Sequence, residues 1–137
     1  MTCKFSSIAI AALALLLALP LLAHHAFSAE YDANKTIVLN GIVTKIDWMN
    51  PHVRFFVDVK DEKGNVTTWD LELQSPNSLT RNGWTRHTLK PGDAVKVSAF
   101  LAKDGSKRAN ARGSVTLADG HQIFAGSSGD DNGPDAK

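Results

Sequence analysis

Hydrophobic and polar residues alternate strictly in several short segments, which predicts strands that are buried on one face. Apolar residues occupy every second position in residues 52–60, and the same period returns in 66–73 and 94–101. Residues 36–48 are rich in β-branched side chains, and Gly41 at their centre predicts a bulge or sharp bend in one long strand. The chain is therefore predicted to be mainly β.

One helix is predicted between the third and fourth of these strands. Ser75 is a good helix-capping residue, Pro76 suits the first helical position, and Gly83 can end the helix after about two turns. Further strands are predicted near 109–117 and 121–124. This order favours a small OB-like barrel of five to six strands with one short helix, and a small β-sandwich is the alternative.

An apolar run near the start of the chain has the pattern of a secretory signal peptide. Lys4 supplies the positive charge, residues 8–19 are all Ile, Leu or Ala, and Pro20 ends the run. Ala23 places a small residue at the cleavage position. The alternative is a membrane anchor, but the run is shorter than the roughly 20 residues that span a bilayer. We therefore expect a periplasmic protein without a stable membrane anchor after cleavage.

Composition divides the chain into a signal peptide at 1–23, a barrel domain at 24–126 and a disordered acidic tail at 127–137. Cleavage removes Lys4, so the remaining 14 lysines and arginines equal the 14 aspartates and glutamates. Proteins that bind nucleic acid normally have a basic surplus, so nucleic acid is not expected as a partner. Cys3 is the single cysteine and leaves with the leader, which excludes disulfides from the mature domain.

Two histidines next to the predicted cleavage site are candidate metal ligands. After cleavage, His24 would carry a free α-amine beside its imidazole, and the two nitrogens can chelate one ion. His25 or His52 could add a second imidazole, and such a nitrogen-rich set suits copper(II) most. The alternative is a frayed terminus that binds nothing. Copper is the candidate cofactor, and no other cofactor is indicated.

A second group of residues could form a ligand-binding face at the mouth of the barrel. Trp48, Asn50 and His52 surround an Asn-Pro turn between the first two predicted strands. Trp84 and Arg86 follow the predicted helix, and an arginine beside an indole can hold a carboxylate or phosphate. The alternatives are a rigid turn with a surface histidine, indoles that pack on the helix or in the core, and a solvated arginine.

The residues give no support for catalysis. Asp70 and Glu72 point to one face of a strand, but nothing in the sequence places a nucleophile beside them. The sequence contains no nucleophile elbow, no phosphate-cradling loop and no metalloprotease helix. We therefore expect a non-catalytic binding module for a small ligand or a protein partner. A copper-binding protein that uses the terminal histidines is the alternative.

Five stretches of the mature domain form a distinctive set, namely HHAFSAEYD, NPH, WDLELQSPNSLTRNGWTR, LKPGD and AKDGSKRANARGSVTLADG. The set resembles a group of small exported bacterial proteins that is known as a domain of unknown function. The resemblance covers the chain up to the acidic tail. It implies a location in the periplasm of Gram-negative bacteria and a single OB-like domain, and it implies no activity.

The predicted leader can be tested by measuring the intact mass of the exported protein. Cleavage after Ala23 leaves 114 of the 137 residues, beginning at His24. A mass that includes the leader would contradict this prediction. If His24 is the first residue, one extra N-terminal residue should weaken copper binding, because it displaces the α-amine, and equal binding would rule out the terminal chelate.

Overall fold

The computed structural model describes residues 26–111 and 113–124. The helices and strands follow the order α2 (Ala26–Glu30), β1 (Tyr31–Asp47), β2 (Arg54–Lys60), β3 (Val66–Glu72), α3 (Pro76–Arg81), β4 (Ala94–Ala102), β5 (Arg108–Asn110), β6 (Ser114–Leu117) and β7 (Gln122–Phe124). Contacts divide the chain after Glu30, and each part is a separate unit. All seven strands belong to the second unit.

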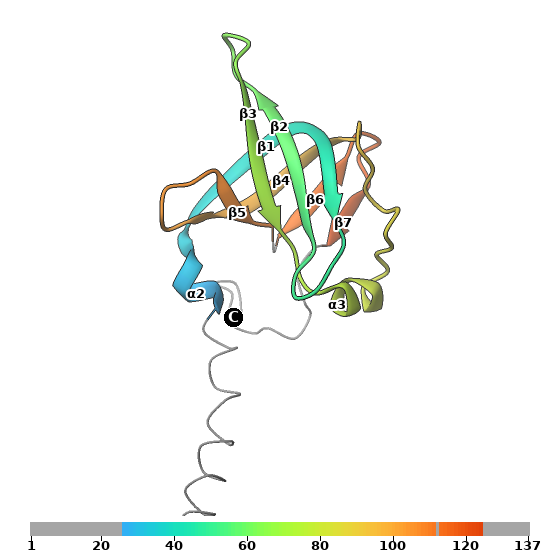
Figure 1. The fold of residues 1–137 in the computed structure, drawn as a ribbon. Coiled ribbons are helices and arrows are strands. Elements are labelled where there is room, and N and C mark those ends of the chain that lie inside the picture. Colours follow the sequence, from blue (N-terminus) through green and yellow to red (C-terminus); the bar gives the residue numbers. More distant parts are fainter. Residues whose placement is uncertain (1–25, 112, 125–137) are drawn as a thin grey trace, which may run out of the picture. The chain divides into compact units, whose positions relative to one another are not determined.

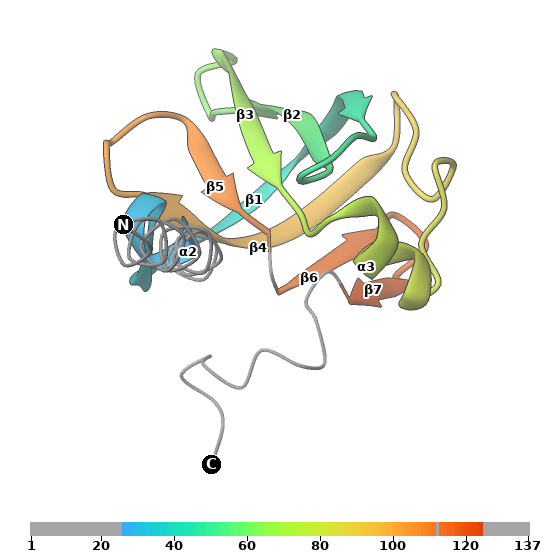
Figure 2. The same ribbon diagram turned by 60° about the horizontal axis from the view of Figure 1, so that its bottom comes forward.

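Five strands close into a barrel, which confirms the predicted fold class. The strand order is β1-β2-β3-β5-β4, and a further pairing of β1 with β4 completes the ring. Strands β6 and β7 continue the sheet beyond β4, outside the ring (Figures 1 and 2). The short helix lies between β3 and β4, as the sequence predicts. Among the described residues, no helix is long and apolar enough to cross a membrane.

Strand β1 closes the barrel because it pairs with two strands in turn. Its residues 36–42 pair with β4, and residues 42–47 pair with β2. Gly41 lies at this transition, where a Cβ atom would come within 2.3 Å of the Asp58 carbonyl oxygen. A register shift then leaves Thr44 without a counterpart on β2, which is the geometry of a β-bulge. The glycine and the bulge together bend the long strand around the barrel.

The core follows the alternation that the sequence shows. In each of β2, β3 and β4 the buried residues lie two positions apart, as expected for strands that have one face toward a core. The largest fully buried side chains of the barrel include Phe55, Leu71, Leu79 and Trp84. These apolar side chains supply the main driving force for closing the barrel, because each removes a large apolar area from water.

Helix α3 begins and ends as predicted. Ser75 is its N-cap, and the Ser75 hydroxyl accepts a hydrogen bond of 3.3 Å from the backbone N–H of Ser78. Gly83 follows the helix with a φ of +86°, a conformation that glycine adopts readily. The chain then turns back, and the backbone N–H of Trp84 donates to the Leu79 carbonyl at 3.0 Å. This turn places Trp84 beneath the helix in the core.

The predicted strand near 109–117 is in fact two strands. Strand β5 pairs with β3 in parallel and with Phe100 and Leu101 of β4. After Gly113, strand β6 pairs with Val95 to Val97 farther along the same edge of β4. The alternation of apolar residues is the same on both sides of the break, so it could not reveal the interruption.

The hairpin between β2 and β3 is closed by a side chain as well as by the backbone. The Asp61 carboxylate accepts hydrogen bonds from the side chain and backbone N–H of Asn65 and from the backbone N–H of Lys63. These bonds, led by the one from the Asn65 side chain, lower the pKa of Asp61 below its usual range. The turn is therefore held best above the ordinary aspartate pKa and loosens as the carboxylate is protonated in acid.

Replacement of Gly41 by alanine should destabilise the barrel strongly. The added Cβ would overlap the Asp58 carbonyl and the Val57 side chain, so we expect the free energy of unfolding to fall by about 1–3 kcal/mol. Urea denaturation measures this change. Asn40→Ala is the matched control, since Asn40 is exposed on the same strand, and its effect should stay within about 0.5 kcal/mol. Equal stabilities of the two variants would contradict the close-approach role of Gly41.

Candidate functional site

A small hollow opens at the end of the barrel where β1 ends. Its lining residues are Ile46, Trp48, Val53, Phe55, Leu73, Trp84, Thr85, Arg86 and Leu89. Its volume is about 10 Å³, close to the space that one water molecule occupies. Pockets that enclose small molecules usually measure roughly 300–1,000 Å³. The hollow can therefore receive one small group of a partner but cannot enclose a whole ligand.

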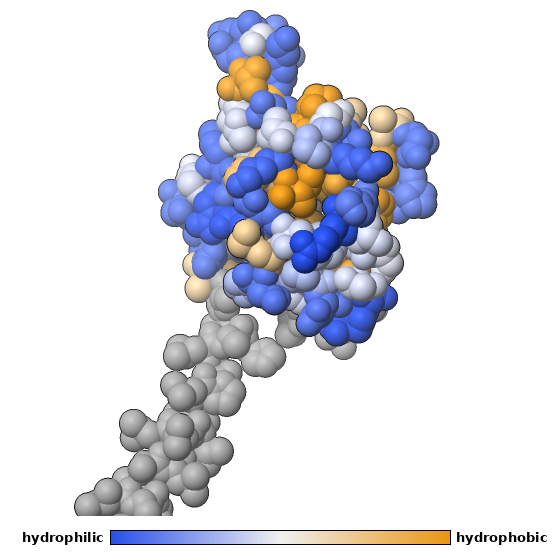
Figure 3. Space-filling model, turned by 45° about the vertical axis from the view of Figure 1, so that its right-hand side comes forward, coloured by the Kyte–Doolittle hydropathy of each residue, from blue (hydrophilic) through white to orange (hydrophobic). Residues whose placement is uncertain are grey.

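Three of the five predicted ligand-binding residues come together in this hollow. Trp48 follows β1 and packs partly against the core, whereas Trp84 and Arg86 come from the connection after α3. Arg86 is exposed, and no described carboxylate pairs with it. Figure 3 shows this side of the molecule, where hydrophobic surface is set among hydrophilic side chains. The hollow thus has apolar walls and one cation at its rim.

Trp84 lies at the boundary between the core and the hollow. Its exposed fraction is only 2%, so it is a core residue whose side chain forms part of the floor of the hollow. The cause is the turn at Gly83, which directs the chain back onto the helix. Trp84 can touch only what enters the hollow.

Asn50 and His52 do not line the hollow. Asn50 is exposed and precedes Pro51 through a cis peptide bond. Met49, beside them in the same loop, is 59% exposed. The loop therefore separates Trp48, which faces the hollow, from His52, which belongs to another group of side chains.

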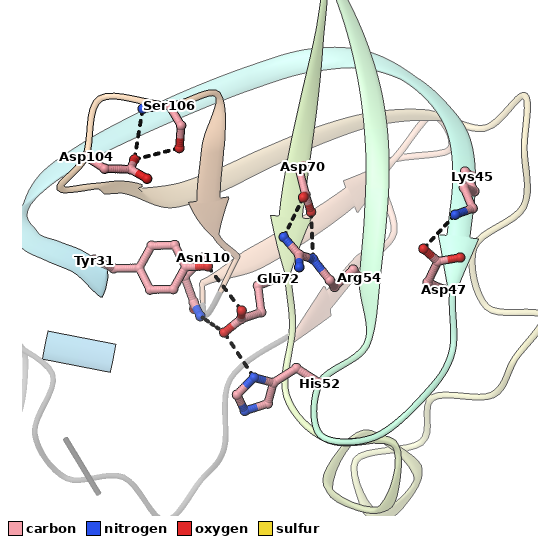
Figure 4. A network of polar contacts seen from close by, with 10 residues as sticks. All are labelled: Tyr31, Lys45, Asp47, His52, Arg54, Asp70, Glu72, Asp104, Ser106 and Asn110. Atoms are coloured by element: carbon pink, nitrogen blue, oxygen red, sulfur yellow. Dashed lines mark hydrogen bonds and ion pairs between the residues drawn. The ribbon is translucent and has the colours of Figure 1, made fainter. Parts of the chain in front are cut away.

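That other group is a polar cluster, centred on the Glu72 carboxylate and formed by Tyr31, His52, Glu72 and Asn110 (Figure 4). The Tyr31 hydroxyl donates to Glu72 Oε2 at 3.1 Å, and the Asn110 amide donates to Oε1 at 3.2 Å. His52 Nδ1 lies 3.2 Å from the same Oε1. Two hydrogen bonds and the close approach of an imidazole nitrogen therefore surround one carboxylate, whose side chain is only 12% exposed.

The sheet itself brings the members of the polar cluster together. Glu72 alternates with Leu71 and Leu73 of the core, so its side chain lies on the outer face of the barrel. Asn110 on β5 is its register partner. His52 is held beside the end of β3 because the backbones of Val53 and Leu73 are hydrogen-bonded at 2.8 Å. The geometry around Glu72 thus follows from strand pairing, which is rigid compared with a loop.

Asn110 is unusual because it is a polar residue that is 5% exposed. Its amide nitrogen bonds Glu72, whereas its Oδ1 is buried without a hydrogen-bond partner in the described part of the chain. Turning the amide over would place Oδ1 against the carboxylate, where two acceptors repel each other. The carboxylate therefore fixes the orientation of this amide.

Asp70 lies two residues before Glu72 on the same strand face, but its environment differs. Both Asp70 oxygens accept hydrogen bonds from the Arg54 guanidinium, one of them at 2.9 Å from Nε. This pair balances a full positive charge against the carboxylate. Glu72 has no lysine or arginine partner among the described residues, and only His52 could supply a positive charge. The two carboxylates, which the sequence presents as a pair, serve separate interactions.

The structure allows only a limited test of the predicted metal ligands. His24 and His25 lie outside the described residues, so the terminal chelate stays a prediction. His52 lies in the polar cluster. Within 26–111 and 113–124, no group of three or more His, Cys, Asp or Glu side chains is arranged to hold a metal ion.

Comparison with known proteins places the chain in a family. A model described as a family of unknown function (DUF6152) matches residues 12–111. The chain belongs to the DUF6152 family. The resemblance to a domain of unknown function is thereby confirmed, but the DUF6152 match ends at Ala111, before the last strands. No curated protein and no solved structure matches the chain significantly.

The polar cluster should contribute to stability through Tyr31. Tyr31→Phe removes a hydroxyl that bonds a largely buried carboxylate, and hydrogen bonds to charged groups contribute about 1.5–3 kcal/mol. Thr68→Val is the matched control, because it removes an exposed hydroxyl that donates to the Asp58 carboxylate at 2.6 Å. Urea denaturation should show a clear loss of stability for the first variant and little for the second. Equal small losses would show that Glu72 does not need the Tyr31 hydroxyl.

Proposed function

We propose that this DUF6152 protein is an exported, periplasmic, non-catalytic binding module. Its contact site is the hollow at the barrel end, which receives one apolar group of a protein partner. The observation that carries the proposal is the convergence of Trp48, Trp84 and Arg86 on the hollow, from two separate parts of the chain. Location in the periplasm rests on the signal-peptide pattern of the leader.

The size of the hollow favours a protein over a small ligand. A space of about 10 Å³ cannot bury most of the surface of a small molecule. Protein interfaces, in contrast, often place a single side chain into a shallow apolar recess near their centre. Met49, which follows Trp48 in the chain, is an exposed hydrophobic residue and could add a further apolar contact for such a partner.

The charge at the rim indicates what the partner carries beside its apolar group. Arg86 has no carboxylate partner within the described residues, although it lines an apolar site. A guanidinium in such a position can take a carboxylate through two parallel hydrogen bonds. The expected partner segment therefore has an aliphatic side chain, of which one methyl group enters the hollow, next to an aspartate, a glutamate or a C-terminal carboxylate.

Nuclear magnetic resonance with a minimal test ligand can examine this site. The chain has three tryptophans, Trp48, Trp69 and Trp84, and only the first and third line the hollow. Addition of 4-methylpentanoate should shift the indole N–H signals of these two and leave the core residue Trp69 unchanged. The uncharged 4-methylpentanamide should bind more weakly, because it lacks the carboxylate for Arg86.

Variants at two arginines provide the control for this titration. Arg86→Gln should weaken binding of 4-methylpentanoate by about two- to fivefold, as expected for loss of an exposed ion pair. Arg81→Gln changes an exposed arginine on α3 that does not line the hollow, so it should have no effect. If the indole signals do not move, or if both variants weaken binding alike, the hollow is not the contact site.

A further inference from the structure

We propose that His52 and Glu72 form a carboxylate–histidine metal site, in which Glu72 holds the Nδ1–H of His52 and a divalent transition-metal ion binds at Nε2. The site lies in the polar cluster and does not involve the hollow. The proposal therefore goes beyond the binding function above and does not depend on it. Copper(II) is the ion expected to bind most tightly, because imidazole sites follow the general order of divalent-metal affinities.

The first argument is the position of the proton on the imidazole. An ionised carboxylate only accepts hydrogen bonds, so the hydrogen is expected on the nitrogen that lies 3.2 Å from Glu72 Oε1. In the neutral ring, this leaves the lone pair on Nε2. Figure 4 shows this second nitrogen on the side of the ring that points away from Glu72. The His52 side chain is 42% exposed, so solvent and ions can reach it.

The second argument is that the carboxylate is itself held in place. The Tyr31 hydroxyl bonds Oε2, and the Asn110 amide bonds Oε1. Tyr31 and Asn110 are both buried, so their positions are fixed by packing. Metal-ligating histidines generally donate their other N–H to such a carboxylate, which sets the tautomer and the direction of the ring. Glu72 is thus a positioning residue for His52.

The third argument is the charge of the polar cluster. Glu72 is largely buried, and no described lysine or arginine pairs with it, whereas its neighbour Asp70 is paired with Arg54. Tyr31 and Asn110 donate hydrogen bonds but bring no charge. A cation bound to His52 would offset this negative charge through the imidazole, and charge complementarity of this kind favours a metal ion over a neutral ligand.

The tautomer of His52 provides a test that needs no metal. Two-bond proton–nitrogen spectra, recorded at a pH where the ring is neutral, distinguish the protonated nitrogen from the free one. We expect the hydrogen on Nδ1 in the native chain. In Glu72→Gln, this preference should weaken, because a neutral amide oxygen is a poorer acceptor than a carboxylate. A native ring with its hydrogen on Nε2 would overturn the proposal.

Copper(II) then tests the binding step. The background is the full mature chain with His24→Gln and His25→Gln, so that the terminal histidines do not compete. His87 and His121 are exposed, and among the described residues neither imidazole forms an ion pair with a carboxylate, so they serve as internal references. Paramagnetic broadening of the His52 ring signals should occur at a copper concentration at least about tenfold lower than that for the references, and Glu72→Gln should remove about tenfold or more of this affinity.

Further variants make each outcome decisive. Proton–nitrogen correlation spectra show whether Glu72→Gln remains folded. Glu72→Asp is the second variant. It keeps the negative charge, but its shorter side chain moves the carboxylate away from His52. Broadening of His52 at the same concentration as His87 and His121 would overturn the proposal. So would an unchanged affinity in both Glu72 variants. If the native chain binds copper without any effect on His52, the terminal-chelate prediction survives and this site does not.

Discussion

The structure depends on the ability of one strand to pair with two others. Strand β1 pairs first with β4 and then with β2, so a single continuous segment closes the ring. Gly41 permits the close approach at the transition. Two further hydrogen bonds link Val43, just beyond it, to the turn that precedes β4. Because of this closure, the ends of β1, β2 and β3 meet the connection after α3, and the apolar hollow forms among them.

The two candidate sites differ in how they are built. Apart from Thr85 and Arg86, the hollow is lined by side chains that belong to the core or pack against it, so its apolar character is a by-product of closing the barrel. The polar cluster is different, because a carboxylate without a fixed cation partner is held on the outer face by a tyrosine, an amide and an imidazole. Such an arrangement costs desolvation energy that a purely structural face would avoid. Asp70 on the same face differs, because its partner is the guanidinium of Arg54 on β2.

Much of the fold could be predicted from the sequence, because its signals are local. Alternation placed the buried faces of β2, β3 and β4, and Ser75 and Gly83 gave the ends of α3. The polar cluster could not be predicted in this way. Tyr31 is 41 positions and Asn110 is 38 positions from Glu72, and only the parallel pairing of β5 with β3 brings the amide to the carboxylate. The position of the Trp84 indole depends on the turn at Gly83 and not on the period of the sequence.

The strands outside the ring have a consequence for solubility. The family match ends at Ala111, directly after β5, so the closed ring lies within it and β6 and β7 do not. One edge of β4 pairs with β1, and β6 covers residues 95–97 on the other edge. A chain cut at Ala111 would keep all five ring strands but expose a row of unpaired backbone groups on β4. Exposed edges of this kind invite strands of neighbouring molecules, so the final hairpin protects residues 95–97 of β4 from such pairing and moves the edge of the sheet to β7.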